Sequence, residues 1–296
     1  MARPLRKPEL EHSSDRLPPM AAPSLFGAAD RLDVRHRGDD FRLLRGDCLA
    51  TLTALPAASI DLIFADPPYF LSNGGSTCAS GKRASVHKGG WDASRGIDRD
   101  HAFNMAWLRA CQRILKPSGT IWVSGTQHVI FSIGFAMQSL GYHLLNTITW
   151  FKPNASPNLA CRMFTHSTEM VLWAAPMRQK KLLHTFHYRD MKADNGGKQM
   201  RDLWQLPEPG GEQVVWSIPT PPKSEKSAGR HPTQKPLSLL ERIVRAGSSP
   251  GQVVLDPFNG SGTTGVAAVS AGRRYVGIDV DDTYLDLTAR RLRGLP

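Results

Sequence analysis

The chain has 296 residues, which is long enough for one large α/β domain with an added module and short for two full-sized domains. Hydrophobic residues make up 41% and charged residues 21%, so disorder, collagen and coiled coil are poor interpretations. The net charge of +11 favours a polyanionic partner, nucleic acid before a membrane, although a merely basic soluble protein has the same balance.

The four cysteines are too scattered for a C-x-x-C metal pair and too few for a disulfide framework. The N-terminus lacks the apolar segment of a signal peptide, and no apolar run reaches the roughly 18 residues of a membrane helix. We therefore expect a soluble, cytoplasmic protein.

Residues 1–38 carry several prolines and no regular periodicity, so we expect a flexible arm. After it, apolar runs alternate with amphipathic segments, which is typical of a parallel sheet with helices on its faces. The expected strands are 41–45, 60–65, 120–124, 144–151, 169–173, 253–255 and 275–279. The expected helices are 48–55, 101–115, 130–140, 236–246, 265–271 and 282–293.

Two stretches interrupt this alternation. Residues 70–95 are glycine- and serine-rich and basic, and we expect a long loop there. The periodicity also fades over 177–230, an irregular insert rich in glycine and proline that could read bases through its Arg, Asn and Gln side chains. The insert divides one domain into a half at 39–176 and a second half at 231–296.

A glycine-rich turn indicates a cofactor site. Residues 254–265 form an apolar strand, the turn and a helix start, a geometry that lets the backbone approach a nucleoside-type ligand. About twenty residues later a strand ends in Asp279, whose carboxylate could accept the hydroxyls of a ribose. The alternative is tight strand-to-helix packing without a ligand.

The motif Asp66-Pro67-Pro68-Tyr69 ends the strand at 60–65. Together with Asp256-Pro257-Phe258-Asn259-Gly260-Ser261-Gly262, it resembles the exocyclic-amino DNA methyltransferases that use S-adenosylmethionine. The catalytic motif precedes the cofactor motif, as in the β group of these enzymes. The resemblance extends to 64–73, 157–159 and 231–236, and is greatest to members with short adenine-containing sites of the GATC kind and to cell-cycle relatives.

The resemblance implies a doubly wound, mostly parallel α/β sheet of the class I methyltransferase type, circularly permuted, with an inserted recognition region. It also implies the cofactor contacts. Asp256, Phe258 and Gly260 would surround the methionine part, Asp279 would hold the ribose, and Asp47 and Cys48 would lie near the adenine. Thr233 and Lys235 would flank the methionine carboxylate, although Lys235 could equally be a solvated surface lysine. The remaining predicted cofactor residues are Asp66, Asn259, Gly262 and Thr263.

The chemistry explains the catalytic motif. The lone pair of an exocyclic amine is delocalised into the base, so acceptors aimed at its N–H bonds must turn that pair toward an electrophilic methyl group. The Asp66 carboxylate can accept one N–H and the Pro67 carbonyl, fixed beside Pro68, the other. Tyr69 offers a ring on which a flipped base can stack. The competing interpretation is a turn that merely ends a strand.

Basic residues are concentrated in residues 71–95 and 146–189, where phosphate contacts would use them. A solvated basic surface is the alternative. Trp204 and Trp216 could pack in a core or act as wedges between bases. The predicted DNA-contacting residues are Lys82, Arg83, Lys88, Lys152, Arg162, Lys198, Arg201 and Arg230.

We therefore predict a site-specific DNA methyltransferase that acts on adenine N6. Cytosine N4 is the nearest alternative, although those enzymes more often carry serine in place of Asp66. Methyltransferases of protein glutamine or RNA commonly carry asparagine there and place the cofactor motif first, and a DNA-binding module without catalysis is a further alternative. The expected partners are DNA and a cognate restriction endonuclease, and the resemblance suggests a homodimer.

Overall fold

The computed structural model describes residues 25–72, 74, 76–79, 82–85, 89–155, 157–159, 161–177, 181, 183–204, 221–226, 229 and 231–295. At positions 76–79, 82–85, 204, 223 and 226 it describes the backbone alone.

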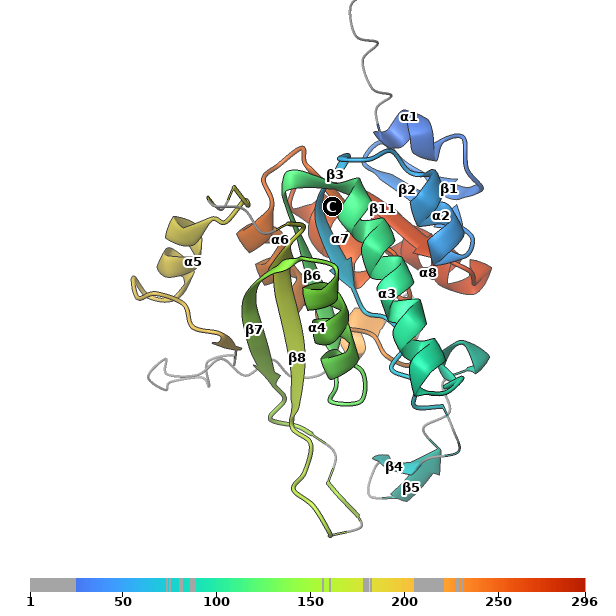
Figure 1. Cartoon of the computed structure of the whole chain (residues 1–296), viewed down its shortest axis with the longest axis vertical. Helices are drawn as coiled ribbons and strands as arrows, with labels where there is room; N and C mark the ends of the chain where they lie inside the picture. Colours follow the sequence, from blue (N-terminus) through green and yellow to red (C-terminus); the bar gives the residue numbers. More distant parts are fainter. Residues whose placement is uncertain are drawn as a thin grey trace, which may run out of the picture.

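A twisted sheet forms the centre of the molecule (Figure 1). In the described part of the chain its order is β1-β2-β11-β10-β3-β6-β8-β7-β9, with β1 and β8 antiparallel to the other strands. This is the predicted α/β class with a mostly parallel sheet. The strands are β1 (Val34–Arg37), β2 (Phe41–Arg45), β3 (Ile60–Ala65), β6 (Leu115–Gly125), β7 (His143–Phe151), β8 (Thr168–Ala175), β9 (Leu203–Trp204), β10 (Val253–Asp256) and β11 (Arg274–Asp279).

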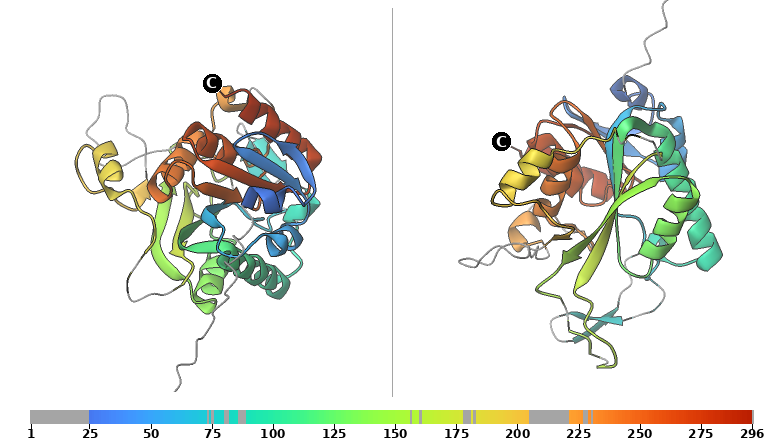
Figure 2. Two further views of the ribbon diagram at one scale, coloured as in Figure 1. Left: turned by 90° about the horizontal axis from the view of Figure 1, so that it is seen from above. Right: turned by 60° about the vertical axis from the view of Figure 1, so that its left-hand side comes forward.

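Helices cover both faces of the sheet (Figure 2). On one face lie α2 (Cys48–Ala54), α3 (Ile97–Ile114) and α4 (Ile130–Ser139), and on the other lie α6 (Leu237–Gly247), α7 (Thr263–Ser270) and α8 (Asp282–Arg293). Because both faces are covered, a central strand such as β3 is buried at every position, and it reads as a continuous apolar run rather than an alternating one.

The strand order brings the two sequence motifs together. β3, which leads into the catalytic motif, pairs in parallel with β10, which leads into the glycine-rich turn, through Val254 opposite Leu62. β11 lies on the other side of β10. Since the carboxyl ends of parallel strands share one edge, the ends of β3, β10 and β11 open onto the same crevice.

The predicted arm is partly wrong, because residues 25–38 are ordered. α1 (Leu25–Ala29) buries Leu25 and Phe26 in the core, and β1 adds an antiparallel edge strand to β2. The guanidinium groups of Arg42 and Arg274 lie over the Phe26 ring, at 4.4 and 3.7 Å from its centroid. These long-range contacts stabilise a segment whose hydrophobic pattern is too short to predict a helix or a strand.

Other boundaries also differ from expectation. α3 begins four residues earlier than predicted, with Asp98 and Asp100 in its first turn, where acidic side chains complement the helix dipole. Residues 116–119 belong to β6 rather than to a turn, and Lys116 Nζ pairs with Asp61 Oδ1 at 2.8 Å. The loop at 70–95 contains a hairpin of β4 (Ser76–Ala79) and β5 (Lys82–Ser85), and the insert contains α5 (Tyr188–Asp194) and β9, which extends the sheet.

Two extensions project from the same end of the molecule. The β4–β5 hairpin follows the carboxyl end of β3, and the β7–β8 loop, residues 152–167, follows that of β7. Figure 1 and the right-hand view of Figure 2 show both at the lower end, beyond the edge of the sheet. Among the residues described, no helix is long and apolar enough to cross a membrane.

Candidate active site

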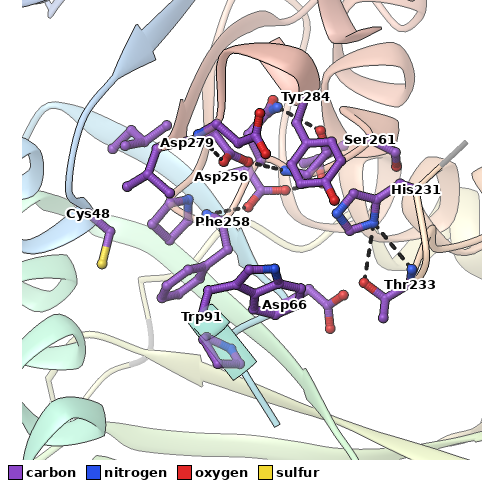
Figure 3. Close-up of a pocket in the computed structure, with 18 of the residues that line it drawn as sticks. Cys48, Asp66, Trp91, His231, Thr233, Asp256, Phe258, Ser261, Asp279 and Tyr284 are labelled. Carbon is purple, nitrogen blue, oxygen red and sulfur yellow. Dashed lines mark hydrogen bonds between the residues drawn. The ribbon is translucent and has the colours of Figure 1, made fainter. Parts of the chain in front are cut away.

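A cavity of about 400 Å³ opens at the carboxyl ends of β3, β10 and β11 (Figure 3). Cys48 lies on one side of it, His231 and Thr233 on the other, and Asp256 and Asp279 between them. The carboxylates of Asp66, Asp256 and Asp279, from distant parts of the sequence, therefore converge here, as expected for the ends of neighbouring parallel strands. The predicted residues that line the cavity are Asp47, Cys48, Asp66, Pro68, Thr233, Lys235, Asp256, Phe258, Asn259, Gly260, Thr263 and Asp279.

Two of these carboxylates form the wall beside the glycine-rich turn. Asp256 accepts hydrogen bonds from the Phe258 amide at 3.0 Å and the Thr264 hydroxyl at 2.6 Å. Asp279 accepts from the Gly260 amide at 2.8 Å. Burial raises the pKa of Asp256 to about 7 and that of Asp279 to about 6, although these donors act in the opposite direction. Both carboxyls are therefore prepared for a cationic or hydroxyl-bearing ligand that favours the ionised form.

The turn itself depends on its glycines. Gly262 has φ +71° and does not line the cavity; a Cβ there would lie 2.3 Å from Thr288 Cγ2, so its role is close packing against α8. The Asn259 side chain is also engaged internally, since it accepts from Tyr275 Oη at 2.9 Å and donates to Thr288 Oγ1 at 2.9 Å. These two predicted cofactor residues shape the turn rather than present free polar groups.

The opposite wall comes from the start of α2. Asp47 caps this helix by accepting from the Leu49 and Ala50 amides, each at 3.0 Å. Burial raises the pKa of the Cys48 thiol to about 12, so the side chain is a neutral, weakly polar wall. This fits its predicted place beside a nucleobase and gives it no nucleophilic role.

Asp66 follows β3 directly and is held by three donors. Its Oδ1 accepts from the hydroxyls of Tyr69 at 2.8 Å and Ser124 at 2.7 Å, and its Oδ2 accepts from Lys235 Nζ at 2.5 Å. Ser124 comes from the neighbouring strand β6. The carboxylate therefore has a fixed orientation at the edge of the cavity.

Glu169 extends this network on its other side. Its Oε2 lies 3.3 Å from Tyr69 Oη and 3.8 Å from Lys235 Nζ, and its Oε1 lies 2.9 Å from Lys152 Nζ. Burial by itself lowers the pKa of Lys235, but the carboxylates of Asp66 and Glu169 outweigh it and raise that pKa. Two carboxylates and two ammonium groups thus form a charge-balanced, largely buried cluster.

Two expectations change with this cluster. Lys235 is only 7% exposed, so the surface-lysine alternative is wrong, and its ion pair with Asp66 was not predicted. Lys152 was predicted to contact DNA, but it is paired with Glu169 and mostly buried, and therefore belongs to the site. Tyr69 is 8% exposed with Lys235 Nζ 5.3 Å from its ring centroid, and its stacking role stays a prediction.

Several lining residues were missed by the sequence reasoning. His231 packs edge-on against Tyr284 with ring centroids 4.3 Å apart, and its Nδ1 accepts from the Thr233 amide at 3.2 Å. His231 stands in a quoted motif and could have been found, whereas Trp91 and Tyr284 carry no local signal. The further unpredicted lining residues are Gly46, Phe64, Arg95, Phe103, Pro257, Ser261, Thr264, Ile278, Val280 and Asp281.

Of the remaining predicted DNA contacts, three have described side chains, and none of these three lines the cavity. Arg162, Lys198 and Arg201 are exposed, on the β7–β8 loop and in the insert. Lys82 and Arg83 lie on β5, where only the backbone is described. Lys88, Arg230 and Trp216 and the Trp204 side chain lie outside the described residues.

Comparison with known proteins identifies the family of the chain. The profile of the N6/N4 methyltransferase family, described as DNA methylase, matches residues 60–290. The chain belongs to this family. It is 48% identical over 250 residues to the type II methyltransferase M2.DpnII of Streptococcus pneumoniae, covering 84% of this chain and 88% of that protein. It is 43% identical to M2.MboI of Moraxella bovis, covering 88% and 91%.

Solved structures share the fold. The cytosine-N4-specific PvuII DNA methyltransferase superposes with a TM-score of 0.67 at 19% identity, covering 90% of each chain. The M1.HpyAVI–SAM complex superposes with a TM-score of 0.57 at 23% identity, covering 86% of this chain and all of that one. Family membership confirms the predicted enzyme class, a DNA methyltransferase that uses S-adenosylmethionine.

Proposed function

We propose that this enzyme methylates adenine N6 within a short DNA sequence and that Asp66 is its catalytic carboxylate. The observation that carries this proposal is the position of Asp66, which borders the cofactor cavity while three donors fix its orientation. A carboxylate presented in this way can accept a hydrogen bond from an incoming amine without reorganising.

The count of lone pairs indicates how the amine is received. Asp66 Oδ1 already accepts two hydroxyl hydrogens and Oδ2 accepts one ammonium hydrogen, so an acceptor position remains on Oδ2. One N–H of the target amine would bond there and the other to the Pro67 carbonyl, which directs the nitrogen lone pair away from both. The carboxylate also stabilises the positive charge that develops on the amine as its bond to carbon forms.

The cavity fits the methyl donor. S-adenosylmethionine supplies an electrophilic methyl group and carries cationic and hydroxyl groups. The residues that would hold it are Asp279 at the ribose, Asp47 and Cys48 at the adenine, and Asp256 and Thr233 at the methionine part. A cavity of about 400 Å³ whose lining combines apolar side chains with several carboxylates suits a ligand of this size and polarity.

The identity of residue 66 favours adenine over cytosine. Cytosine-N4 enzymes of this group more often carry serine at this position, whereas this chain has an aspartate that is ion-paired and hydrogen-bonded. Enzymatic hydrolysis of methylated DNA followed by mass spectrometry tests the choice. N6-methyladenine as the product supports the proposal, and N4-methylcytosine alone would overturn it. Asp66→Ala should give no product while still binding the cofactor in calorimetry.

The β4–β5 hairpin and the β7–β8 loop are the proposed DNA contacts, since both project beside the cavity and carry basic residues. A cognate restriction endonuclease would act in the same system, in the cytoplasm, and a homodimer remains part of the proposal. Sedimentation of the purified enzyme with and without DNA tests the dimer.

A further inference from the structure

The buried carboxylate of Asp92, which lies outside the cofactor motifs, accepts hydrogen bonds from the segment that follows Pro67 and Pro68. Asp92 lies in a short 3-10 turn, Gly90–Asp92, and is 1% exposed. It faces residues 69–72, which we call the catalytic loop because Asp66 and the two prolines lead directly into it. Sequence analysis assigned Asp92 only to a long basic loop.

Four donors of the catalytic loop converge on this one side chain. Asp92 Oδ1 accepts from the Tyr69 amide at 2.8 Å and the Phe70 amide at 2.9 Å. Asp92 Oδ2 accepts from the Leu71 amide at 3.3 Å and the Ser72 hydroxyl at 2.9 Å. The Ser72 amide also donates to the Asp92 carbonyl at 3.1 Å.

This arrangement fixes a backbone conformation that would not persist unaided. Phe70 has φ +58°, a left-handed conformation that is unfavourable by about 1–2 kcal/mol for a residue with a side chain. With this bend the amides of Tyr69, Phe70 and Leu71 all point at the Asp92 carboxylate. Among the ion pairs of the described residues none includes Asp92, so these hydrogen bonds compensate for burying its charge.

Asp92 also joins the catalytic loop to the cofactor cavity. Its neighbour Trp91 lines the cavity and is 42% exposed, and Arg95 lines it three residues later. The excursion that carries the β4–β5 hairpin leaves the fold after Ser72 and returns at the same 3-10 turn. The Asp92 carboxylate therefore joins the two ends of this excursion. It fixes the catalytic loop, the 3-10 turn and the cavity wall at Trp91 relative to one another.

We propose that Asp92 is a positioning residue for methyl transfer, which aligns the catalytic loop with the cofactor cavity without touching either substrate. The inference rests on the proposed role of Asp66. An asparagine of the same shape has one acceptor oxygen, and its amide group would oppose two of the four donors. Asp92→Asn should therefore release the loop while leaving the cavity walls in place.

The test compares Asp92→Asn with Asp98→Asn, which removes an exposed carboxylate from the first turn of α3. Single-turnover methylation should fall at least thirtyfold in Asp92→Asn, with the dissociation constant for S-adenosylmethionine changed less than threefold. Hydrogen–deuterium exchange should accelerate in a peptide covering 69–72 and not elsewhere. Asp98→Asn should match the wild type in all three measurements.

A second variant, Ser72→Ala, is needed in case Asp92→Asn does not fold. It removes one of the four hydrogen bonds to the Asp92 carboxylate and should slow single-turnover methylation about threefold to fivefold. A wild-type rate in folded Asp92→Asn, or in Ser72→Ala if the first variant fails, would overturn the inference. Loss of cofactor binding in parallel with activity would also overturn it, because a general structural role predicts that result. If Asp66→Ala retains activity, the proposed function itself fails, whatever the Asp92 variants do.

Discussion

Lys235 Nζ lies 2.5 Å from Asp66 Oδ2, although the two residues are 169 positions apart in the sequence. The resemblance assigned Lys235 to the methionine carboxylate, yet in the structure it forms an ion pair with Asp66, the proposed catalytic carboxylate, and is also part of the cavity wall. The lysine therefore joins the segment that precedes α6 to the carboxyl end of β3.

Replacing this cation should slow methyl transfer. In Lys235→Met, Asp66 keeps its two hydroxyl donors but loses the ammonium group that holds Oδ2. Because the carboxylate is then less well oriented toward the target amine, we expect the single-turnover rate at pH 7 to fall about tenfold or more, which corresponds to about 1.4 kcal/mol of transition-state stabilisation. Single-turnover methylation by both proteins measures the effect.

Lys116→Met is the matched control, because Lys116 pairs with the buried Asp61 at 2.8 Å at the other end of β3. It removes a similar ion pair and should lower stability without slowing single-turnover methylation. A wild-type single-turnover rate in Lys235→Met would contradict the role of the lysine.

Cofactor affinity should depend on pH. Burial raises the pKa of Asp256 to about 7 and that of Asp279 to about 6, so in the free enzyme both carboxyls gain protons as the pH falls through this range. A ligand with cationic groups binds the ionised form better. We expect S-adenosylmethionine to bind about tenfold more weakly at pH 6 than at pH 8, measured by calorimetry.

S-adenosylhomocysteine is the matched ligand, since it lacks the positive charge on sulfur and should show a smaller dependence. Asp256→Asn should bind S-adenosylmethionine more weakly at pH 8 and should flatten the dependence. Equal affinity of the wild type for S-adenosylmethionine at pH 6 and pH 8 would argue against the role assigned to these carboxyls.

The glycine-rich turn should depend on Gly262 for packing more than for backbone freedom. Gly262→Ala places a Cβ 2.3 Å from Thr288 Cγ2 at φ +71°, whereas Gly251→Ala meets open space at φ +78°. The backbone strain is similar, about 1–2 kcal/mol. Overpacking against α8 should cost Gly262→Ala about 1–3 kcal/mol more in the free energy of unfolding. Urea unfolding of both variants measures the difference, and equal losses would show that backbone strain alone matters.

The sheet and the convergence of three aspartates at its edge were predictable because their signals are local. The buried strand β3 is a continuous apolar run, and the turn after β10 has its glycines where the chain takes left-handed conformations. Parallel pairing then requires Asp66, Asp256 and Asp279 to share one crevice. These inferences needed only the motifs and the general geometry of doubly wound sheets.

The contacts that support the site could not be predicted in the same way. Glu169 was assigned only to a strand, and Lys152 was predicted to contact DNA. The antiparallel pairing of β7 with β8 brings these two residues together, and Glu169 also lies 3.3 Å from Tyr69 Oη. Asp92 looked like one acid in a basic loop, because its partners lie on the far side of a hairpin excursion. Single residues that act through long-range pairing leave no periodic signal in the sequence.

The β7–β8 loop presents an aromatic side chain that should contact DNA. Phe164 is 97% exposed, and the turn before it is held by Asn158 Nδ2, which donates to the Met163 carbonyl at 2.8 Å. An aromatic ring in this position can stack on or wedge between bases, a contact worth about 1–3 kcal/mol per base. Phe164→Ala should therefore raise KM for DNA about tenfold, with the melting temperature and cofactor affinity unchanged.

Met177→Ala is the matched control, because Met177 is 58% exposed but follows β8 at the opposite edge of the sheet, away from the cavity. It should leave KM for DNA unchanged. Fluorescence of 2-aminopurine at the target position separates two roles for Phe164: a wedge should lose base flipping with the side chain, whereas a surface contact should lose affinity alone. Phe164 is so exposed that its ring can affect KM only by contacting DNA directly. An unchanged KM for DNA in Phe164→Ala would therefore exclude the β7–β8 loop tip from the DNA interface.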